Sequence, residues 1–202
     1  MNIVVATCKN RGIGINNKLP WRLLADTYFF KYLTIGNKNN AVIMGKNTYL
    51  SLPKPLKYRD NYILSTTLNE SKKNIFTYKS LDNLRSKMFK YDNVYLIGGE
   101  RVYYENINKP FIHGIYHTKV HEEYECDTFF PKIPEKFNKI HSVNFQDNDK
   151  KNKKKVFFDI DVYHNTEFNV DTTLNSGNLI KDLHIALHKL ELHHDISCLK
   201  NN

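Results

Sequence analysis

Two kinds of hydrophobic pattern alternate along most of this chain. Short apolar runs rich in Val, Ile, Tyr and Phe are typical of half-buried strands. Between the early runs lie segments whose pattern is typical of helices. The predicted strands are 2–8, 41–44, 61–65, 74–77, 93–97, 113–120, 139–145 and 156–163. The predicted helices are 24–35, 47–52, 80–89 (with Ser80 as its N-cap) and 100–106.

The order of these elements predicts an α/β fold. Strands that alternate with helices usually form a mostly parallel sheet. Because no helical pattern separates 139–145 from 156–163, these two strands should close the sheet as an antiparallel hairpin. We therefore expect one domain over residues 1–164, with a central mixed, mostly parallel sheet, flanking helices and a C-terminal antiparallel hairpin.

The pattern changes after this domain. Residues 165–177 are polar and rich in Thr, Asn, Ser and Gly, which is typical of a linker. An amphipathic helix over 178–197 is predicted by four leucines at helical spacing, Leu179, Leu183, Leu187 and Leu190. Such a helix is marginal in water, so it should pack on the rest of the chain, on a second copy or on another protein. Residues 165–202 are thus predicted to be a linker and helical extension.

Two histidines on this extension raise the question of a metal. His184 and His188 lie four residues apart, a spacing that can hold zinc. No cysteine or third fixed ligand accompanies them, which favours a solvated polar helix face. No metal site is predicted.

The net charge leaves two interpretations open. The chain has 30 Lys and Arg against 21 Asp and Glu, a formal net charge of +9. Part of the excess lies in Lys150–Lys155, which is either a solvated hairpin tip or a nucleic-acid site. No aromatic residue is interleaved there, which favours the tip. A positive potential also suits a cleft for phosphates and carboxylates.

The cysteines and the absence of a membrane-length apolar run bear on location. Cys8, Cys126 and Cys198 are odd in number and show no CxxC spacing, which argues for a reducing compartment. The chain opens with a strand-like segment and has no basic leader before it. We expect a cytoplasmic protein.

One carboxylate is placed for acid catalysis. An apolar strand runs into Gly12-x-Gly14, the only Trp follows at Trp21, and Asp26 comes five residues later among large apolar residues. Apolar surroundings disfavour the charged form of a carboxyl group, so Asp26 could hold a proton near neutral pH. The alternative is a carboxylate that only satisfies backbone donors at a helix start.

Glycines mark two candidate phosphate cradles. Gly45 and the pair Gly98–Gly99 each follow an apolar strand and precede a helix, with Lys46 and Arg101 beside them. Glycine lets a phosphate approach backbone N–H groups closely. A strand–Gly–helix turn is also common packing, so neither junction is specific alone.

Six segments in one order carry a resemblance to the dihydrofolate reductase family, over residues 1 to about 164. These segments are 12–26, 42–53, 56–66, 94–103, 116–118 and 126–131. The resemblance implies reduction of 7,8-dihydrofolate to 5,6,7,8-tetrahydrofolate with NADPH, by hydride transfer to C6 and protonation of N5. It also implies a place in one-carbon and thymidylate metabolism, and antifolate binding.

The resemblance implies a full set of site residues and no metal ligand. Catalysis would involve Asp26, Trp21 and Thr118. The cofactor would contact Thr7, Ile13, Leu19, Gly45, Lys46, Asn47, Thr48, Ser65, Thr66, Gly98, Gly99, Glu100, Arg101, Val102 and Tyr103. The substrate would contact Val5, Asp26, Phe30, Lys31, Leu52, Leu56, Arg59, Ile97 and Thr118.

On the substrate side the resemblance also assigns roles. Asp26 would hydrogen-bond the pterin ring and support protonation of N5, with Thr118 behind its carboxylate. Phe30 would pack on the ring, and it would belong to the core as well. Arg59 would pair with the α-carboxylate of the glutamate, and Lys31 would add a weaker charge at that end.

On the cofactor side the chain departs from the family at two positions. Lys46 stands where many members have Arg, and with Thr66 it would meet the 2′-phosphate of NADPH. Glu100 follows the glycine pair where a small residue is common, and it would repel the pyrophosphate unless Arg101 or a capping role neutralised it. The loop 15–21 would close over the nicotinamide.

Three rival interpretations remain. The riboflavin-pathway reductase shares the fold, but we would not expect it to carry Leu19-Pro20-Trp21 with an acid five residues on, or Arg59. A nucleic-acid-binding protein would use the basic surface, although no RNA-binding or helix-turn-helix signature is present. An interaction role for 165–202 is the third.

Overall fold

The computed structural model describes residues 1–37, 39–168, 179–193 and 198–199. The strands are β1 (Asn2–Thr7), β2 (Gly12–Gly14), β3 (Asn40–Gly45), β4 (Asp60–Leu64), β5 (Ser71–Lys72), β6 (Ile75–Tyr78), β7 (Asn93–Leu96), β8 (Gly114–Val120), β9 (Thr128–Phe129), β10 (Phe137–Asp149), β11 (Lys154–Asn165) and β12 (Cys198–Leu199). The helices are α1 (Leu24–Ile35), α2 (Lys46–Ser51), α3 (Leu81–Leu84), the 3₁₀ helix η1 (Arg85–Lys90), α4 (Glu100–Asn106) and α5 (Leu179–His193).

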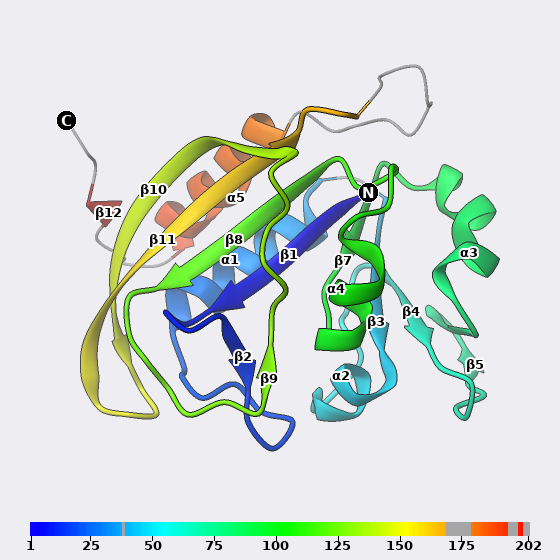
Figure 1. The fold of residues 1–202 in the computed structure, drawn as a ribbon, viewed down its shortest axis with the longest axis horizontal. Helices are drawn as coiled ribbons and strands as arrows, with labels where there is room; N and C mark the ends of the chain where they lie inside the picture. Colours follow the sequence, from blue (N-terminus) through cyan, green and yellow to red (C-terminus); the bar gives the residue numbers. More distant parts are fainter. Residues whose placement is uncertain (38, 169–178, 194–197, 200–202) are drawn as a thin grey trace.

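A ten-stranded sheet, shown in Figure 1, carries the fold. Its order is β12-β10-β11-β8-β1-β7-β3-β4-β6-β5, and the strands from β8 to β6 run parallel. The pairs at both edges are antiparallel, including the long β10–β11 hairpin. The predicted mixed, mostly parallel sheet with a closing hairpin is confirmed.

The short elements are the ones that differ most from the prediction. The helix predicted over 80–89 is a single α-turn followed by η1, and Ser80 does cap it, because its hydroxyl accepts from Asn83 N–H at 3.3 Å. The strands β2, β5, β9 and β12 were not predicted, since two or three residues are too few to show a period. Of the predicted tail helix, 194–197 lie outside the described residues, as does most of the linker.

Helices cover both faces of the sheet, and each face has its own apolar core. In Figure 1, α1 and α5 lie side by side behind the sheet, while α4 lies in front of it. Phe29 and Leu33 of α1 share one buried cluster with Leu183 of α5. Met88 and Val102 belong to the cluster on the opposite face. No helix among the described residues is long and apolar enough to cross a membrane.

The leucine stripe of the tail packs on this same chain. The buried apolar side chains of α5 are Leu179, Leu183, Ala186 and Leu190, and Leu187 is partly buried against the same cluster. Tyr116 of β8 donates its hydroxyl hydrogen bond to the Leu179 carbonyl at 3.1 Å. The sequence left three possible packing partners for the leucine stripe: the rest of the chain, a second copy or another protein. In the structure the stripe packs on the rest of the chain.

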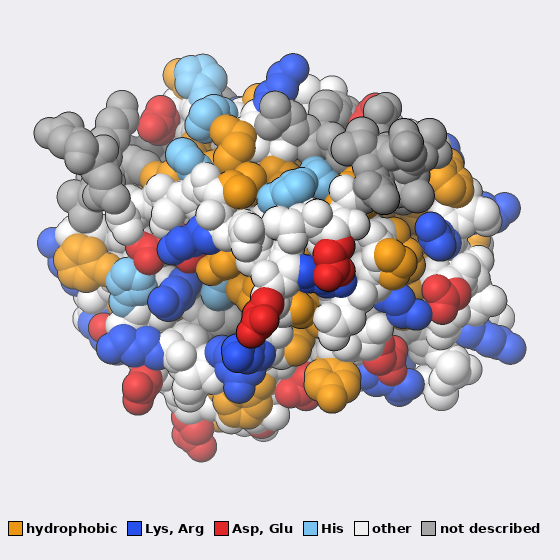
Figure 2. Space-filling model, turned by 45° about the horizontal axis from the view of Figure 1, so that its top comes forward, with side chains coloured by type: hydrophobic (Ala, Val, Ile, Leu, Met, Phe, Trp, Pro, Cys, Tyr) orange, Lys and Arg blue, Asp and Glu red, His pale blue; other side chains and the backbone are white. Residues whose placement is uncertain are grey.

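Charges of both signs are interspersed on the face shown in Figure 2, where histidines gather near its upper edge. His141 of β10 and His184 of α5 make an edge-to-face ring contact, with centroids 5.8 Å apart. Within the described ranges, no three His, Cys, Asp or Glu side chains come together in a way that could hold a metal.

Candidate active site

A cleft of about 1250 Å³ opens at the carboxyl ends of β1, β3, β4 and β7. Ligands of open α/β sheets bind at this edge, where the strands end and the loops begin. Every site residue predicted from the sequence lines this cleft except Thr7 and Trp21. The fold therefore gathers residues from five sequence segments into one site.

Asp26 lies in the first turn of α1 and is partly open to the cleft. Burial of its carboxyl group raises the pKa to about 6; a hydrogen bond with Thr118 opposes this rise and the nearby Asp147 carboxylate adds to it. The Ala25 N–H at this helix end donates to Asp147 at 2.9 Å. Asp147 thus supplies a capping acceptor, and Asp26 stays available to the cleft.

Trp21 does not line the cleft, although Leu19, two residues before it, does. Its side chain is 2% exposed, and its ring packs against Tyr124 with centroids 5.3 Å apart. The buried indole Nε1 has no hydrogen-bond partner among the described residues. An unsatisfied buried donor of this kind is a place where a bound water would be stabilised.

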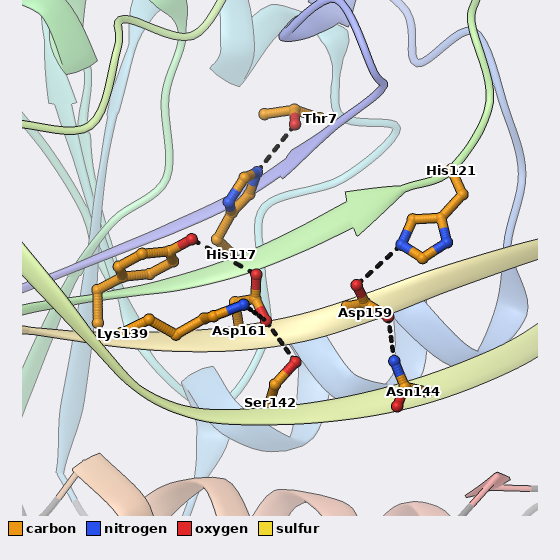
Figure 3. A network of polar contacts seen from close by, with 9 residues as sticks. Thr7, His117, His121, Lys139, Ser142, Asn144, Asp159 and Asp161 are labelled. Carbon is orange, nitrogen blue, oxygen red and sulfur yellow. Dashed lines mark hydrogen bonds and ion pairs between the residues drawn. The ribbon is translucent and has the colours of Figure 1, made fainter. Parts of the chain in front are cut away.

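The Thr7 side chain does not line the cleft and belongs to the polar network of Figure 3. Its hydroxyl lies 2.8 Å from Nε2 of His117. Burial lowers the pKa of His117 to about 4, so this imidazole is neutral at physiological pH. On β10 and β11 the network continues through Asp161, which contacts Lys139 and Ser142.

The tip of the β10–β11 hairpin holds the loop before α1, which no sequence pattern had indicated. Lys151 Nζ donates to the Leu19 carbonyl at 2.8 Å, and Asn152 Nδ2 donates to the Pro20 carbonyl at 3.0 Å. Asp149 accepts from Arg22 N–H at 3.0 Å. The lysine-rich run is a hairpin tip, as favoured, but part of it is bound to the chain and not only solvated.

Asp149 is the centre of this tip and is fully buried. Burial alone would raise its pKa, but hydrogen bonds from Asn152, Arg22 N–H, Tyr124 and Lys151 N–H outweigh that effect and lower the pKa to about 2. The carboxylate is therefore ionised at any physiological pH. A buried charge with this many donors rigidifies the segments that supply them.

The two glycine junctions form one cradle. Gly45 N–H donates to the Gly98 carbonyl at 2.7 Å, and the Gly98–Gly99 peptide bond is cis. A Cβ on Gly45 would lie 3.1 Å from Val102, and one on Gly99 would lie 3.1 Å from the Thr48 hydroxyl. Side chains at these positions would crowd the walls of the cleft, which explains the need for glycine.

The charged residues around this cradle have partners of their own. Lys46 Nζ donates to the Thr67 hydroxyl at 2.9 Å, and Thr67 also lines the cleft. The family motifs predict Thr66 and not Thr67 as a partner of Lys46, since only the fold turns the Thr67 hydroxyl toward Lys46.

Glu100 and Arg101 do not neutralise each other. Glu100 accepts from Phe129 N–H of β9 at 2.8 Å, whereas Arg101 pairs with Glu105 at 2.6 Å on the surface. The carboxylate of Glu100 therefore has a backbone donor on β9 as its partner, and Arg101 has a different partner on its own helix.

A buried cation, Arg59, also lines the cleft. Arg59 is 7% exposed, and its Nη1 donates to the Lys31 carbonyl at 3.3 Å and to the Thr34 hydroxyl. Its guanidinium lies over the Phe30 ring, 5.7 Å from the centroid. Burial lowers the pKa of Arg59 to about 10, which leaves it positively charged at neutral pH.

Fold and site together define a class: an α/β protein in which two strand–glycine–helix junctions and an acid with a raised pKa line one cleft. The dihydrofolate reductase family model matches residues 1–163. The chain is 38% identical to the dihydrofolate reductase of Drosophila melanogaster over 151 residues, covering 69% of this chain and 83% of that protein. Corresponding values are 40% over 158 residues (69% and 82%) for Gallus gallus and 36% over 182 residues (81% and 96%) for Sus scrofa. The chain belongs to the dihydrofolate reductase family, and it is therefore an oxidoreductase.

Proposed function

We propose that the cleft residues carry out the reaction of this family in the following way. The chain reduces 7,8-dihydrofolate to 5,6,7,8-tetrahydrofolate with NADPH as the cofactor. The observation that carries the assignment of roles is Asp26, a carboxyl group with a raised pKa in the same cleft as the glycine cradle.

The residues fit a dinucleotide with an extra phosphate. Gly45, Gly98 and Gly99 leave the space that side chains would fill, and Lys46 supplies a positive charge at the rim. The remaining cofactor contacts are the lining residues predicted above, with Thr67 added. When bound, the nicotinamide supplies the hydride that reaches C6 of the substrate.

Asp26 controls protonation of the pterin. Its neutral form predominates below pH 6, and about a tenth of the molecules still hold the proton near pH 7, so the acid can supply the proton that N5 requires. Thr118 orients the carboxyl group, and Trp21 anchors the end of the loop 15–21 against Tyr124. Leu19, which is 49% exposed at the rim, excludes water when this loop covers the nicotinamide.

Arg59 and Phe30 bind the rest of the substrate. The guanidinium of Arg59 pairs with the glutamate α-carboxylate, and Lys31 adds a second charge. Leu52 and Leu56 form the apolar wall beside the benzoyl group. Antifolates would occupy the same pocket.

The proposal places the protein in the cytoplasm, in one-carbon and thymidylate metabolism. Cys8 and Cys126 are free thiols with their sulfurs 3.8 Å apart, which suits a reducing compartment.

Spectrophotometry tests the proposed activity directly. Purified full-length protein, NADPH and dihydrofolate should give loss of NADPH absorbance, with one tetrahydrofolate formed per NADPH consumed. Omitting dihydrofolate should abolish the loss, and an antifolate should inhibit it. Folded protein that consumes no NADPH under these conditions would contradict the proposal.

A further inference from the structure

The C-terminal end of α1 is held by a cation from the tail. The last turn of α1 contains no basic residue of its own. Instead, Lys189 of α5 donates from Nζ to the Gly36 carbonyl at 3.1 Å and to Oδ1 of Asn37 at 2.5 Å. A positive charge beside unpaired carbonyls at a helix C-terminus is stabilising.

The same end of α1 holds Arg59 on its cleft side. The two acceptors for the guanidinium are the Lys31 carbonyl and the Thr34 hydroxyl, both in the second half of this helix. The Thr34 carbonyl is fixed in turn by Asn40 at 3.2 Å. The last turns of α1 therefore lie between the tail and the buried guanidinium.

We propose that Lys189 is a positioning residue for the glutamate end of the substrate. By anchoring the last turn of α1 it keeps the Lys31 carbonyl and the Thr34 hydroxyl in place, and these aim Arg59 at the carboxylate. This inference rests on the proposed role of Arg59. Lys189 lies beyond residue 163, where the family match ends, so the role belongs to the extension of this chain.

Steady-state kinetics with two substrates tests the proposal. In the full-length Lys189→Met variant, KM for dihydrofolate should rise about threefold or more, while kcat and KM for NADPH stay unchanged. With a dihydropterin that lacks the benzoylglutamate group, Lys189→Met should behave as the wild type. Lys189→Arg should restore KM, and His188→Ala, an exposed neighbour on α5, should change nothing.

Other outcomes would overturn the proposal. Equal KM increases for both substrates would show a general structural role for Lys189, and no change in a folded variant would show none; either overturns the inference. The Arg59→Met variant distinguishes a failure of the proposed carboxylate clamp from a failure of the Lys189 inference. If it leaves KM for dihydrofolate unchanged, the proposed carboxylate clamp fails, and the inference with it. If it raises KM while Lys189→Met does not, only the inference fails.

Discussion

The two ends of α1 are held by different segments of the chain, and each end lies beside a different part of the candidate site. At the N-terminal end Leu23 has no capping side chain, and Asp147 of the hairpin accepts the Ala25 N–H. At the C-terminal end Lys189 of the tail caps the carbonyls. An acidic group sits at the positive end and a basic group at the negative end, as the helix dipole favours. Both groups come from more than 100 residues away in the sequence.

The ends also differ in chemistry. Beside the N-terminal end lies Asp26, whose proton is proposed to serve the reaction. Beside the C-terminal end lies Arg59, which is proposed only to bind. Disturbing the first end should therefore change kcat, and disturbing the second should change KM. The predictions below test that separation.

The largest effect is expected for Asp26→Asn. Loss of the general acid should lower kcat at pH 7 by about 100-fold or more, while NADPH affinity, measured by fluorescence titration, stays nearly unchanged. The loss should shrink at low pH, where solvent protonates the substrate directly. Wild-type activity should fall as pH rises through about 6, because the protonated acid is then lost. Wild-type rates in Asp26→Asn at neutral pH would remove Asp26 from the mechanism.

The next largest effect is expected on the free energy of unfolding, when a buried leucine of α5 is truncated. Leu183 is fully buried beside α1, so Leu183→Ala should lower the free energy of unfolding by roughly 2–5 kcal/mol in urea denaturation. Leu192→Ala on the same helix, 66% exposed, is the control and should change it by less than about 0.5 kcal/mol. We propose that 165–202 is an extension accessory to chemistry, so kcat per folded molecule should persist in Leu183→Ala. A large loss of kcat in folded protein would contradict this.

Asp149→Asn should have a smaller effect and should act on the N-terminal end. Removing the buried charge should cost roughly 1.5–3 kcal/mol of stability at pH 7. Because folding lowers the pKa of Asp149 from 3.8 to about 2, its contribution is present above pH 4 and is lost as pH falls toward 2. The difference between wild type and Asp149→Asn should vanish over that window. Asp82→Asn, at an exposed side chain, is the control and should change the free energy of unfolding at pH 7 by less than about 0.5 kcal/mol. A constant difference down to pH 2 would contradict the pKa argument.

The last effect concerns the cofactor and should be no larger than that of Asp149→Asn. Lys46→Ala should weaken NADPH more than NADH, by roughly 1.5–3 kcal/mol at most, because the ammonium is exposed and shared with Thr67. Cofactor titrations of both nucleotides measure the difference, and Lys72→Ala, an exposed lysine that does not line the cleft, is the control. Equal weakening of the two cofactors would place Lys46 at the pyrophosphate they share.

Local patterns determined the main elements, the glycine junctions and Asp26, whereas the family motifs supplied most of the other cleft residues. Alternating apolar residues indicated the long strands and helices, since their periodicity records which face is buried. Glycines at strand ends and one acid among apolar residues marked the cradle and Asp26, because these chemistries depend on immediate neighbours in the chain. The family motifs added Arg59 and Thr118, which no period could have shown.

Only the tertiary structure decided which distant groups meet. The carboxylate of Asp149, the ammonium of Lys189 and the hydroxyl of Thr67 carry no local signal of their partners, since side-chain hydrogen bonds across the sheet depend on register and packing. The leucine stripe predicted that α5 must be covered, but its hydrophobicity is non-directional and could not say by what. Packing against α1 settled that question, and with it what supports each end of the helix that carries Asp26.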